Sequence, residues 1–212
     1  MDKKNTTIII CCAGMGTRLG IGTPKALLNI NNKPLIIHQL ELLKDFEDIR
    51  IVVGFQADKV IETVKKYRKD IMFVFNYDFE NTGPAASLSK AMKNSRKYII
   101  SMDGDVLIKS YDFEKFINYK EECLVVTEEK SDEAIFVDVE NNKAIQFNLN
   151  NRYIWSGIVK IESQRLKNRN DYIYKMIEPL LPLPIINLRT KEVNTQEDYE
   201  RLVDWLNIND KN

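Results

Sequence analysis

The stretch CAGMGTRLGIGTPK, residues 12–25, decides the fold that the sequence predicts. It directly follows the β-branched run of residues 6–11, which predicts a strand. Glycines at positions 14, 16, 20 and 22 allow a sharp turn and let backbone N–H groups approach an anion. Arg18 and Lys25 add positive charge to the same loop. The stretch therefore predicts a phosphate-binding loop after a strand, although the glycines alone suit a flexible loop with two solvated cations equally well.

Two common phosphate loops do not fit these residues. A P-loop needs a glycine, four residues and then Gly-Lys-Ser/Thr, and no lysine here follows a glycine in that way. A dinucleotide-binding loop is closer, but it requires an acidic residue near the end of the second strand to hold the ribose. That predicted strand ends in Val53-Gly54-Phe55-Gln56. The sequence therefore argues against a dehydrogenase.

The first half of the chain alternates short apolar runs with amphipathic segments, which is typical of βαβ units in a mostly parallel sheet. We predict strands at residues 6–11, 50–54, 72–76 and 97–102, and helices at 34–44, 58–67 and 84–94. The second half predicts strands at 123–128, 134–140, 143–148 and 153–162. Asn141-Asn142 predicts a tight hairpin turn between two of them. A last helix, at 195–207 with Thr195 as N-cap, is expected to pack back on the sheet.

The fold class expected from this order is α/β, as one Rossmann-like domain over residues 1–212. Its mostly parallel mixed sheet would be flanked by helices and would carry a small antiparallel β insertion. Residues 1–108 would form a nucleotide-binding half, and residues 109–212 an acceptor-binding half with the closing helix.

The composition limits the kinds of partner that the protein can bind. The chain has 212 residues with 31 basic and 31 acidic side chains, so it lacks the basic excess that binds nucleic acid or an anionic membrane. No apolar stretch approaches the ~20 residues of a membrane span. Three cysteines, two of them adjacent in an apolar run, indicate reduced thiols and a cytoplasmic protein. The sequence does not reveal the oligomeric state.

Met102-Asp103-Gly104-Asp105 closes an apolar strand. Residues at i and i+2 of a strand point to the same side, so both carboxylates can face the crevice where α/β sheets bind ligands. Mg²⁺ binds through one or two carboxylates plus substrate phosphates. Asp105 is therefore the first candidate metal ligand, and Asp103 a second ligand or a nucleotide contact. A solvated Asp-Gly-Asp turn is the alternative.

Together these motifs resemble the GT-A-like nucleotidyltransferases, which include sugar-phosphate and phosphocholine cytidylyl- and uridylyltransferases. Their signature is a strand, Ala/Gly-Gly-x-Gly-x-Arg-Leu/Met and then Pro-Lys. This chain has Ala13-Gly14-Met15-Gly16-Thr17-Arg18-Leu19 followed by Pro24-Lys25. The resemblance implies that Ala13, Gly14, Gly16 and Thr17 bind the nucleotide, that Arg18 and Lys25 are catalytic, and that Mg²⁺ is the cofactor.

The resemblance also assigns roles to later segments. It implies base or ribose contacts from Asn81, Thr82, Gly83 and Ser87, although residues 81–84 taken alone suit a turn and a helix start. It implies that Asn194 completes the metal site with Asp105, in a place where family members usually carry Asp. An Asn carbonyl is a weaker ligand than a carboxylate, so metal affinity or ligand identity is open at this position. Trp155 and Gly157 fall on the implied acceptor-side strand, where Trp155 could face a cationic amine.

The activity that the resemblance implies is transfer of a nucleoside monophosphate from a nucleoside triphosphate to a small phosphorylated acceptor, with release of pyrophosphate. CMP is favoured before UMP, and the acceptor would be phosphocholine-like or a sugar phosphate. Two alternatives stay open: a glycosyltransferase that uses a nucleotide-sugar donor, and a non-catalytic nucleotide-binding regulatory module. The single histidine, His38, lies mid-helix and predicts neither a zinc site nor a Ser-His-Asp triad.

Overall fold

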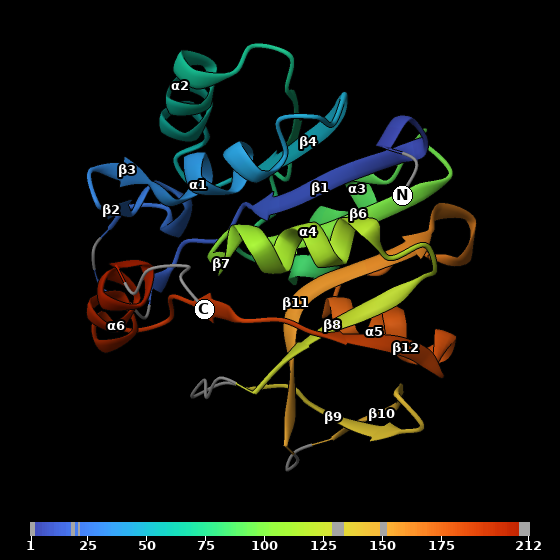
Figure 1. The fold of residues 1–212 in the computed structure, drawn as a ribbon. Helices are drawn as coiled ribbons and strands as arrows, with labels where there is room; N and C mark the ends of the chain where they lie inside the picture. Colours follow the sequence, from blue (N-terminus) through green and yellow to red (C-terminus); the bar gives the residue numbers. More distant parts are fainter. Residues whose placement is uncertain (1–2, 18–19, 21, 129–133, 149–151, 208–212) are drawn as a thin grey trace.

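The computed structural model describes residues 3–17, 20, 22–128, 134–148 and 152–207. Its centre is a nine-stranded mixed sheet in the order β5-β4-β1-β6-β11-β8-β12-β10-β9 (Figure 1). The strands are β1 (Thr6–Cys12), β4 (Asp48–Val53), β5 (Met72–Phe75), β6 (Tyr98–Asp103), β8 (Cys123–Thr127), β9 (Phe136–Glu140), β10 (Lys143–Asn148), β11 (Tyr153–Glu162) and β12 (Leu183–Asn187). The predicted α/β class is thereby confirmed.

The parallel half of the sheet consists of β5, β4, β1 and β6. Helices α1 (Leu35–Leu42), α2 (Ala57–Tyr67) and α4 (Ser110–Asn118) pack on one face, and α3 (Pro84–Ala91) and α5 (Ile173–Ile177) on the other. In Figure 1, α4 lies in front of the sheet and α3 and α5 behind it. Because both faces are covered, consecutive residues of β1 are buried, and Ile8, Ile9 and Ile10 are all 0% exposed.

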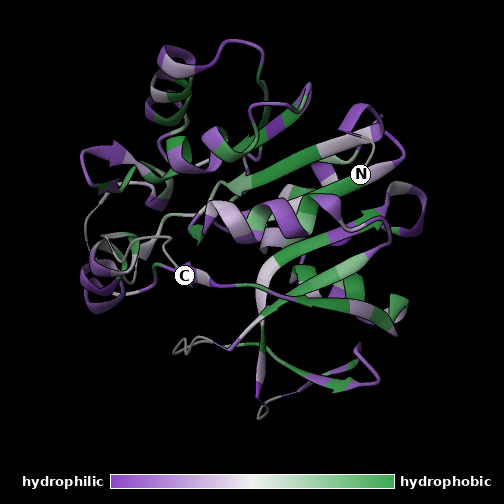
Figure 2. Cartoon of the chain, in the orientation of Figure 1, coloured by the Kyte–Doolittle hydropathy of each residue, from purple (hydrophilic) through white to green (hydrophobic). Residues whose placement is uncertain are grey.

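The second, mixed half begins at β11, which pairs antiparallel with β6 and so joins the two halves of the chain in one sheet. The β9–β10 hairpin closes the far edge. Its turn residues Asn141 and Asn142 have φ angles of 48° and 61°, as the predicted tight turn requires. Figure 2 shows the strands as mostly hydrophobic, with hydrophilic residues on the outer turns of the helices. In the described part of the chain, no helix combines the length and the apolar character needed to cross a membrane.

The last helix, α6 (Gln196–Asn207), does not pack on the large sheet as predicted. It covers two small strand pairs, β2 (Asn29–Ile30) with β3 (Lys33–Pro34) and β7 (Val106–Ile108) with β13 (Thr190–Glu192). Leu202 and Trp205 form a separate apolar cluster there with Ile30 and Leu107. An amphipathic stripe predicts which face is buried but not what covers it. The predicted start of the helix is confirmed, since the Thr195 hydroxyl accepts a hydrogen bond from the Asp198 N–H at 3.1 Å.

Candidate active site

The loop after β1 lies at the carboxyl end of the parallel strands. Gly16 has a φ of 61°, in the left-handed region that favours glycine. A Cβ atom at this position would lie 3.0 Å from Cγ of Lys25. Glycine therefore permits the close approach of the Lys25 side chain to the loop. Arg18, the second predicted cation of this loop, lies outside the described residues.

A cavity of ≈ 650 Å³ opens beside this loop. Of the predicted site residues that the structure describes, all but Asn81 line its wall, namely Ala13, Gly14, Gly16, Thr17, Lys25, Thr82, Gly83, Ser87, Asp103, Asp105, Trp155, Gly157 and Asn194. The exposed amide of Asn81 donates to Asp78 Oδ1 at 2.8 Å, and this residue is not part of the cavity wall.

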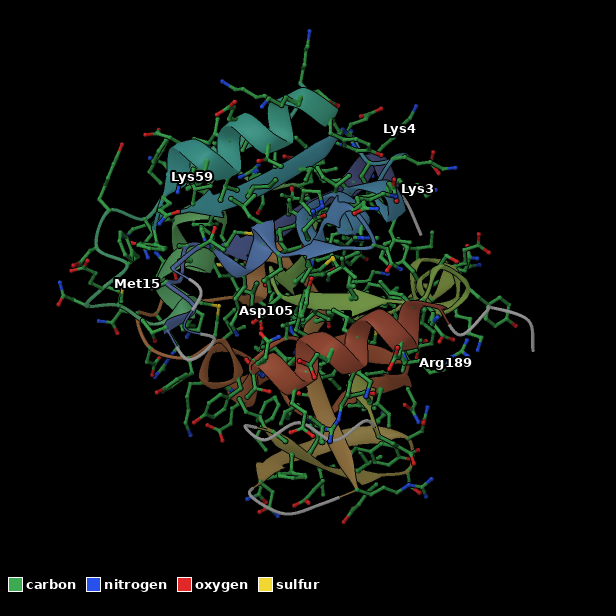
Figure 3. The ribbon with its side chains drawn as sticks, turned by 90° about the vertical axis from the view of Figure 1, so that its left-hand side faces the viewer. Lys3, Lys4, Met15, Lys59, Asp105 and Arg189 are labelled. Carbon is green, nitrogen blue, oxygen red and sulfur yellow. The ribbon has the colours of Figure 1, made fainter. Side chains whose placement is uncertain are left out.

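Three distant segments meet at Lys25. Its Nζ lies 2.8 Å from Asp105 Oδ2 and 2.6 Å from Asn194 Oδ1. The side chains of Lys25 and Asp105 are only 13% and 22% exposed, so solvent screens this ion pair less than a surface pair. Figure 3 shows Asp105 between the N-terminal loop, marked by Met15, and helix α6. The cation and both predicted metal ligands therefore share one site.

Gln39, a buried residue of α1, holds the turn that carries Asp105. Its Nε2 donates to the carbonyl oxygens of Asp103 and Val106, each at 2.8 Å. The two bonds fix the backbone on both sides of Asp105. This role was not predicted, because a glutamine inside an amphipathic pattern carries no sign of its partner.

Carboxylates crowd this end of the cavity. Burial, followed by the negative charge of Asp105, raises the pKa of Glu192 to about 7. Burial and the charges of Asp105 and Glu192 raise the pKa of Asp103 well above its usual value, and the charge of Lys25 opposes this effect. Glu192 was not predicted to be in the site. Its spacing from Asn194 repeats the i, i+2 spacing of Asp103 and Asp105, and that repetition was the available signal.

The donor set suits Mg²⁺ held together with a polyphosphate. In the described ranges, no group of three or more His, Cys, Asp or Glu residues is arranged to hold a metal ion. Asp105 and Asn194 each offer a hard oxygen, and both already face one cation, the Lys25 ammonium. Mg²⁺ commonly takes one or two protein oxygens and completes its shell with water and substrate phosphates. The residues therefore fit a magnesium that arrives with its substrate.

A hydrogen-bond network lies at the predicted nucleobase end of the cavity. Asn76 Nδ2 donates to Thr82 Oγ1 and Ser87 Oγ, each at 3.1 Å. The Thr82 hydroxyl donates to the carbonyl of Asp78 at 2.6 Å. Gly83 packs so tightly that a Cβ atom there would collide with the backbone carbonyl of Asp171. Asn76, which directly follows β5, was not among the predicted site residues.

Aromatic side chains form another part of the cavity wall. Trp155 is 6% exposed, and its Nε1 donates to the Ile158 carbonyl at 3.1 Å. Tyr172 and Tyr174 line the same cavity and stack with their ring centroids 5.7 Å apart. Neither tyrosine was predicted to be in the site, because their segment carries no motif. At Gly157, a Cβ atom would collide with Asp103 Oδ2, so glycine lets this wall approach the acidic end.

Comparisons with known proteins agree with this geometry. Residues 8–165 match the family model described as a MobA-like NTP transferase domain. Choline-phosphate cytidylyltransferase of Streptococcus pneumoniae is 34% identical over 130 residues, which cover 54% of this chain and 54% of that protein. Bifunctional protein GlmU of Aliarcobacter butzleri is 35% identical over 118 residues, covering 55% of this chain and 27% of that protein. The chain thus spans from about a quarter to about a half of the length of these relatives.

Solved structures share the whole fold. CTP:phosphocholine cytidylyltransferase from Streptococcus pneumoniae has a TM-score of 0.77 at 22% identity, and the match covers 95% of this chain and 99% of that one. The inositol-1-phosphate CTP transferase of T. maritima has a TM-score of 0.78 at 17% identity, with 97% of each chain covered. At these identities the likeness shows that the fold is shared.

Proposed function

Because the chain belongs to the MobA-like NTP transferase family, we propose that it transfers a nucleoside monophosphate from a nucleoside triphosphate to a small phosphorylated acceptor and releases pyrophosphate. The observation that carries the proposal is the meeting of Lys25 with Asp105 and Asn194 beside a glycine loop. A site with a lysine, hard oxygen ligands and a nearby glycine loop is suited to a triphosphate.

In the proposed reaction, an oxygen of the acceptor phosphate attacks the α-phosphorus and pyrophosphate leaves in line. A phosphate with a second pKa near 6 is largely ionised at neutral pH, so the attacking oxygen needs no general base. This suits a cavity whose described lining contains no histidine. The loop residues Gly14, Gly16 and Thr17 would bind phosphate oxygens, and Lys25 would offset the charge that develops at the α-phosphate.

Magnesium is part of the proposal. Asp105 and Asn194 would hold it, with Glu192 beside them as a third oxygen donor. When bound, Mg²⁺ supplies neutralisation of the triphosphate charge. Lys25 would then leave the two oxygens that it binds in the structure and turn its ammonium to the phosphates.

We propose CTP as the donor and a phosphocholine-like acceptor. Support for CTP comes from relatives and fold neighbours that are named as cytidylyl- or CTP transferases. Support for the acceptor comes from the wall of Trp155, Tyr172 and Tyr174, because aromatic faces attract alkylammonium groups. Sugar phosphates are the second candidate, since GlmU and mannose-1-phosphate guanyltransferases also match the chain.

The test is release of pyrophosphate with Mg²⁺, four nucleoside triphosphates, and phosphocholine or sugar 1-phosphates as acceptors. Lys25→Ala and Asp105→Ala should each lower the rate roughly 10²-fold or more, as removal of one charge-stabilising group does elsewhere. Lys59→Ala is the control, because Lys59 is exposed on α2, away from Asp105 in Figure 3. Full activity in both site variants would refute the proposal. Release of a nucleoside diphosphate from a nucleotide-sugar would favour the glycosyltransferase instead.

We also propose a cytoplasmic location. The three cysteines carry free thiols, which fits a reducing compartment. Fractionation of cells that produce the tagged protein would test this location.

A further inference from the structure

We infer that Asn76 fixes the direction of a hydrogen-bond network that turns Ser87 into a hydrogen-bond donor toward the nucleobase, and that the site thereby selects cytosine over uracil. The inference rests on the proposed nucleotidyl transfer and deepens it, because it names a residue that determines which triphosphate is used. Asn76 lies outside the motifs that suggested the function.

Asn76 is placed to control two residues of the cavity wall. It follows β5 and is 1% exposed, and its backbone N–H donates to the Val53 carbonyl at 2.9 Å. The backbone position from which its side chain extends is therefore fixed. From there, the amide Nδ2 reaches Thr82 Oγ1 and Ser87 Oγ, both at 3.1 Å. Asn76, Thr82 and Ser87 all border the same cavity.

The Thr82 hydroxyl determines which way the Asn76 amide faces. This hydroxyl has one hydrogen, and at 2.6 Å it donates that hydrogen to the Asp78 carbonyl. Thr82 Oγ1 can therefore only accept a hydrogen bond from Asn76, so the amide nitrogen must face it. A flipped amide would place Asn76 Oδ1 against Thr82 Oγ1 with no hydrogen between the two oxygens.

This orientation has a cost at the Asn76 carbonyl oxygen. Among the described residues, Oδ1 is buried and has no hydrogen-bond partner, which is unfavourable. The Thr82 hydroxyl imposes the orientation despite this cost, because its hydrogen is already donated to Asp78.

Ser87 is thereby left as a donor. Both N–H groups of Asn76 are used, and one of them ends on Ser87 Oγ. Among the described residues, Ser87 Oγ accepts this bond and no acceptor for its own hydrogen is found. Because Ser87 lines the cavity, that hydrogen is available to a ligand.

A serine hydroxyl that donates a hydrogen bond can distinguish cytosine from uracil at one ring atom, N3. N3 of cytosine is a hydrogen-bond acceptor, whereas N3 of uracil or thymine carries a hydrogen. A hydroxyl whose hydrogen points into the cavity binds the first and opposes the second. Reversing the polarity of Asn76 should therefore reverse the preference, because an aspartate would accept the Ser87 hydrogen and leave an oxygen lone pair facing the base.

The experiment compares wild type with Asn76→Asp, Ser87→Ala and the control Asn118→Asp, which adds the same charge at an exposed position of α4. Two quantities are measured at pH 8 with CTP and with UTP: kcat/KM for pyrophosphate release, and the rise in melting temperature without an acceptor. Wild type and Asn118→Asp should prefer CTP at least tenfold. Asn76→Asp should lower the CTP/UTP ratio by roughly 10- to 100-fold, the range expected for one hydrogen bond in a dry site. Ser87→Ala should lower kcat/KM for CTP and should not lower it for UTP.

Several outcomes would overturn the inference. If wild type releases pyrophosphate but prefers UTP, the base assignment is wrong while the proposed function stands. If CTP is preferred and Asn76→Asp, shown by circular dichroism to be folded, keeps the wild-type ratio, Asn76 does not set the preference. If Asn76→Asp does not fold, Ser87→Ala decides, and an unchanged CTP preference in that variant refutes the network. If no triphosphate is used or bound, the proposed function fails together with this inference.

Discussion

At the scale of single residues, Gln39 shows how a side chain outside the cavity can govern the site. It donates from α1 to the carbonyls on both sides of Asp105, each at 2.8 Å. Gln39→Met keeps the size of the side chain and removes both donors. Because a misplacement of about 1 Å can cost ~10²-fold in rate, we expect kcat to fall by about that factor. Leu42→Met on the same helix is the control, and kcat equal to wild type in the Gln39 variant would contradict the role.

Gly83 yields a prediction about stability. A Cβ atom there would collide with the Asp171 carbonyl, whereas a Cβ at Gly14 would meet nothing within 4 Å. Neither residue has a positive φ, so packing alone distinguishes them. We expect Gly83→Ala to lower the free energy of unfolding by about 1–3 kcal/mol, the usual cost of overpacking, and Gly14→Ala to leave it nearly unchanged. Urea unfolding of both variants measures this. Equal stabilities would show that the backbone around Asp171 moves to make room for the added Cβ atom.

At the scale of elements, Arg50 ties β4 to the end of α3. It is 4% exposed, and its Nη1 and Nη2 atoms donate to the carbonyls of Ala91, Lys93 and Asn94 at 2.7–2.9 Å. Arg50→Met would remove the donor that these carbonyls share and would break the ion pair with Asp48. We expect a loss of about 3–5 kcal/mol in the free energy of unfolding. Arg152→Met, which removes an exposed ion pair with Glu128, should cost less than about 1 kcal/mol. Similar losses in both variants would contradict the argument.

Asp112 makes the attachment of α4 sensitive to pH. Burial alone would raise the pKa of Asp112, but hydrogen bonds from Arg189 and Lys115 outweigh it and lower the pKa. The folded protein thus binds this proton less tightly than the unfolded chain does. The stabilisation is therefore full above the unfolded pKa of about 3.9 and is lost as the pH falls through the folded pKa. Asp112→Asn should be less stable than wild type at pH 7, and the difference should shrink toward pH 2. Urea unfolding at a series of pH values tests this, and a difference that stays constant would refute it.

At the scale of the whole molecule, the parallel half could be predicted because each strand is a continuous apolar run between amphipathic segments. The short pairs β2–β3 and β7–β13 could not, since two or three residues carry no periodicity. The same limit applies to the site. Lys25, Asp105 and Asn194 stand in motifs, but Asn76 and Tyr172 come next to the cavity only through the packing of distant segments.

The contact of Lys25 with Asp105 and Asn194 leads to a prediction in which metal binding and activity change in opposite directions. In the structure, Lys25 occupies the place between Asp105 and Asn194 that the proposed Mg²⁺ would take. Without a triphosphate to draw Lys25 away, ammonium and metal compete for the same oxygens, so metal alone should bind weakly and metal with CTP tightly. At 100 times its Kd, a ligand stabilises the fold by about 2.7 kcal/mol, and a thermal-shift assay detects a stabilisation of this size.

Replacing the lysine separates the two effects. Lys25→Ala leaves Asp105, Asp103 and Glu192 without their opposing charge, so the free protein should bind Mn²⁺, a spectroscopic substitute for Mg²⁺, more tightly than wild type does. The same variant should release pyrophosphate at least 10²-fold more slowly, because the α-phosphate loses its cation. Electron paramagnetic resonance of Mn²⁺ measures the first effect independently of turnover. Mn²⁺ affinity that falls together with activity would show that Lys25 does not compete for the metal position, and the ammonium would then have to be assigned a place beside the metal.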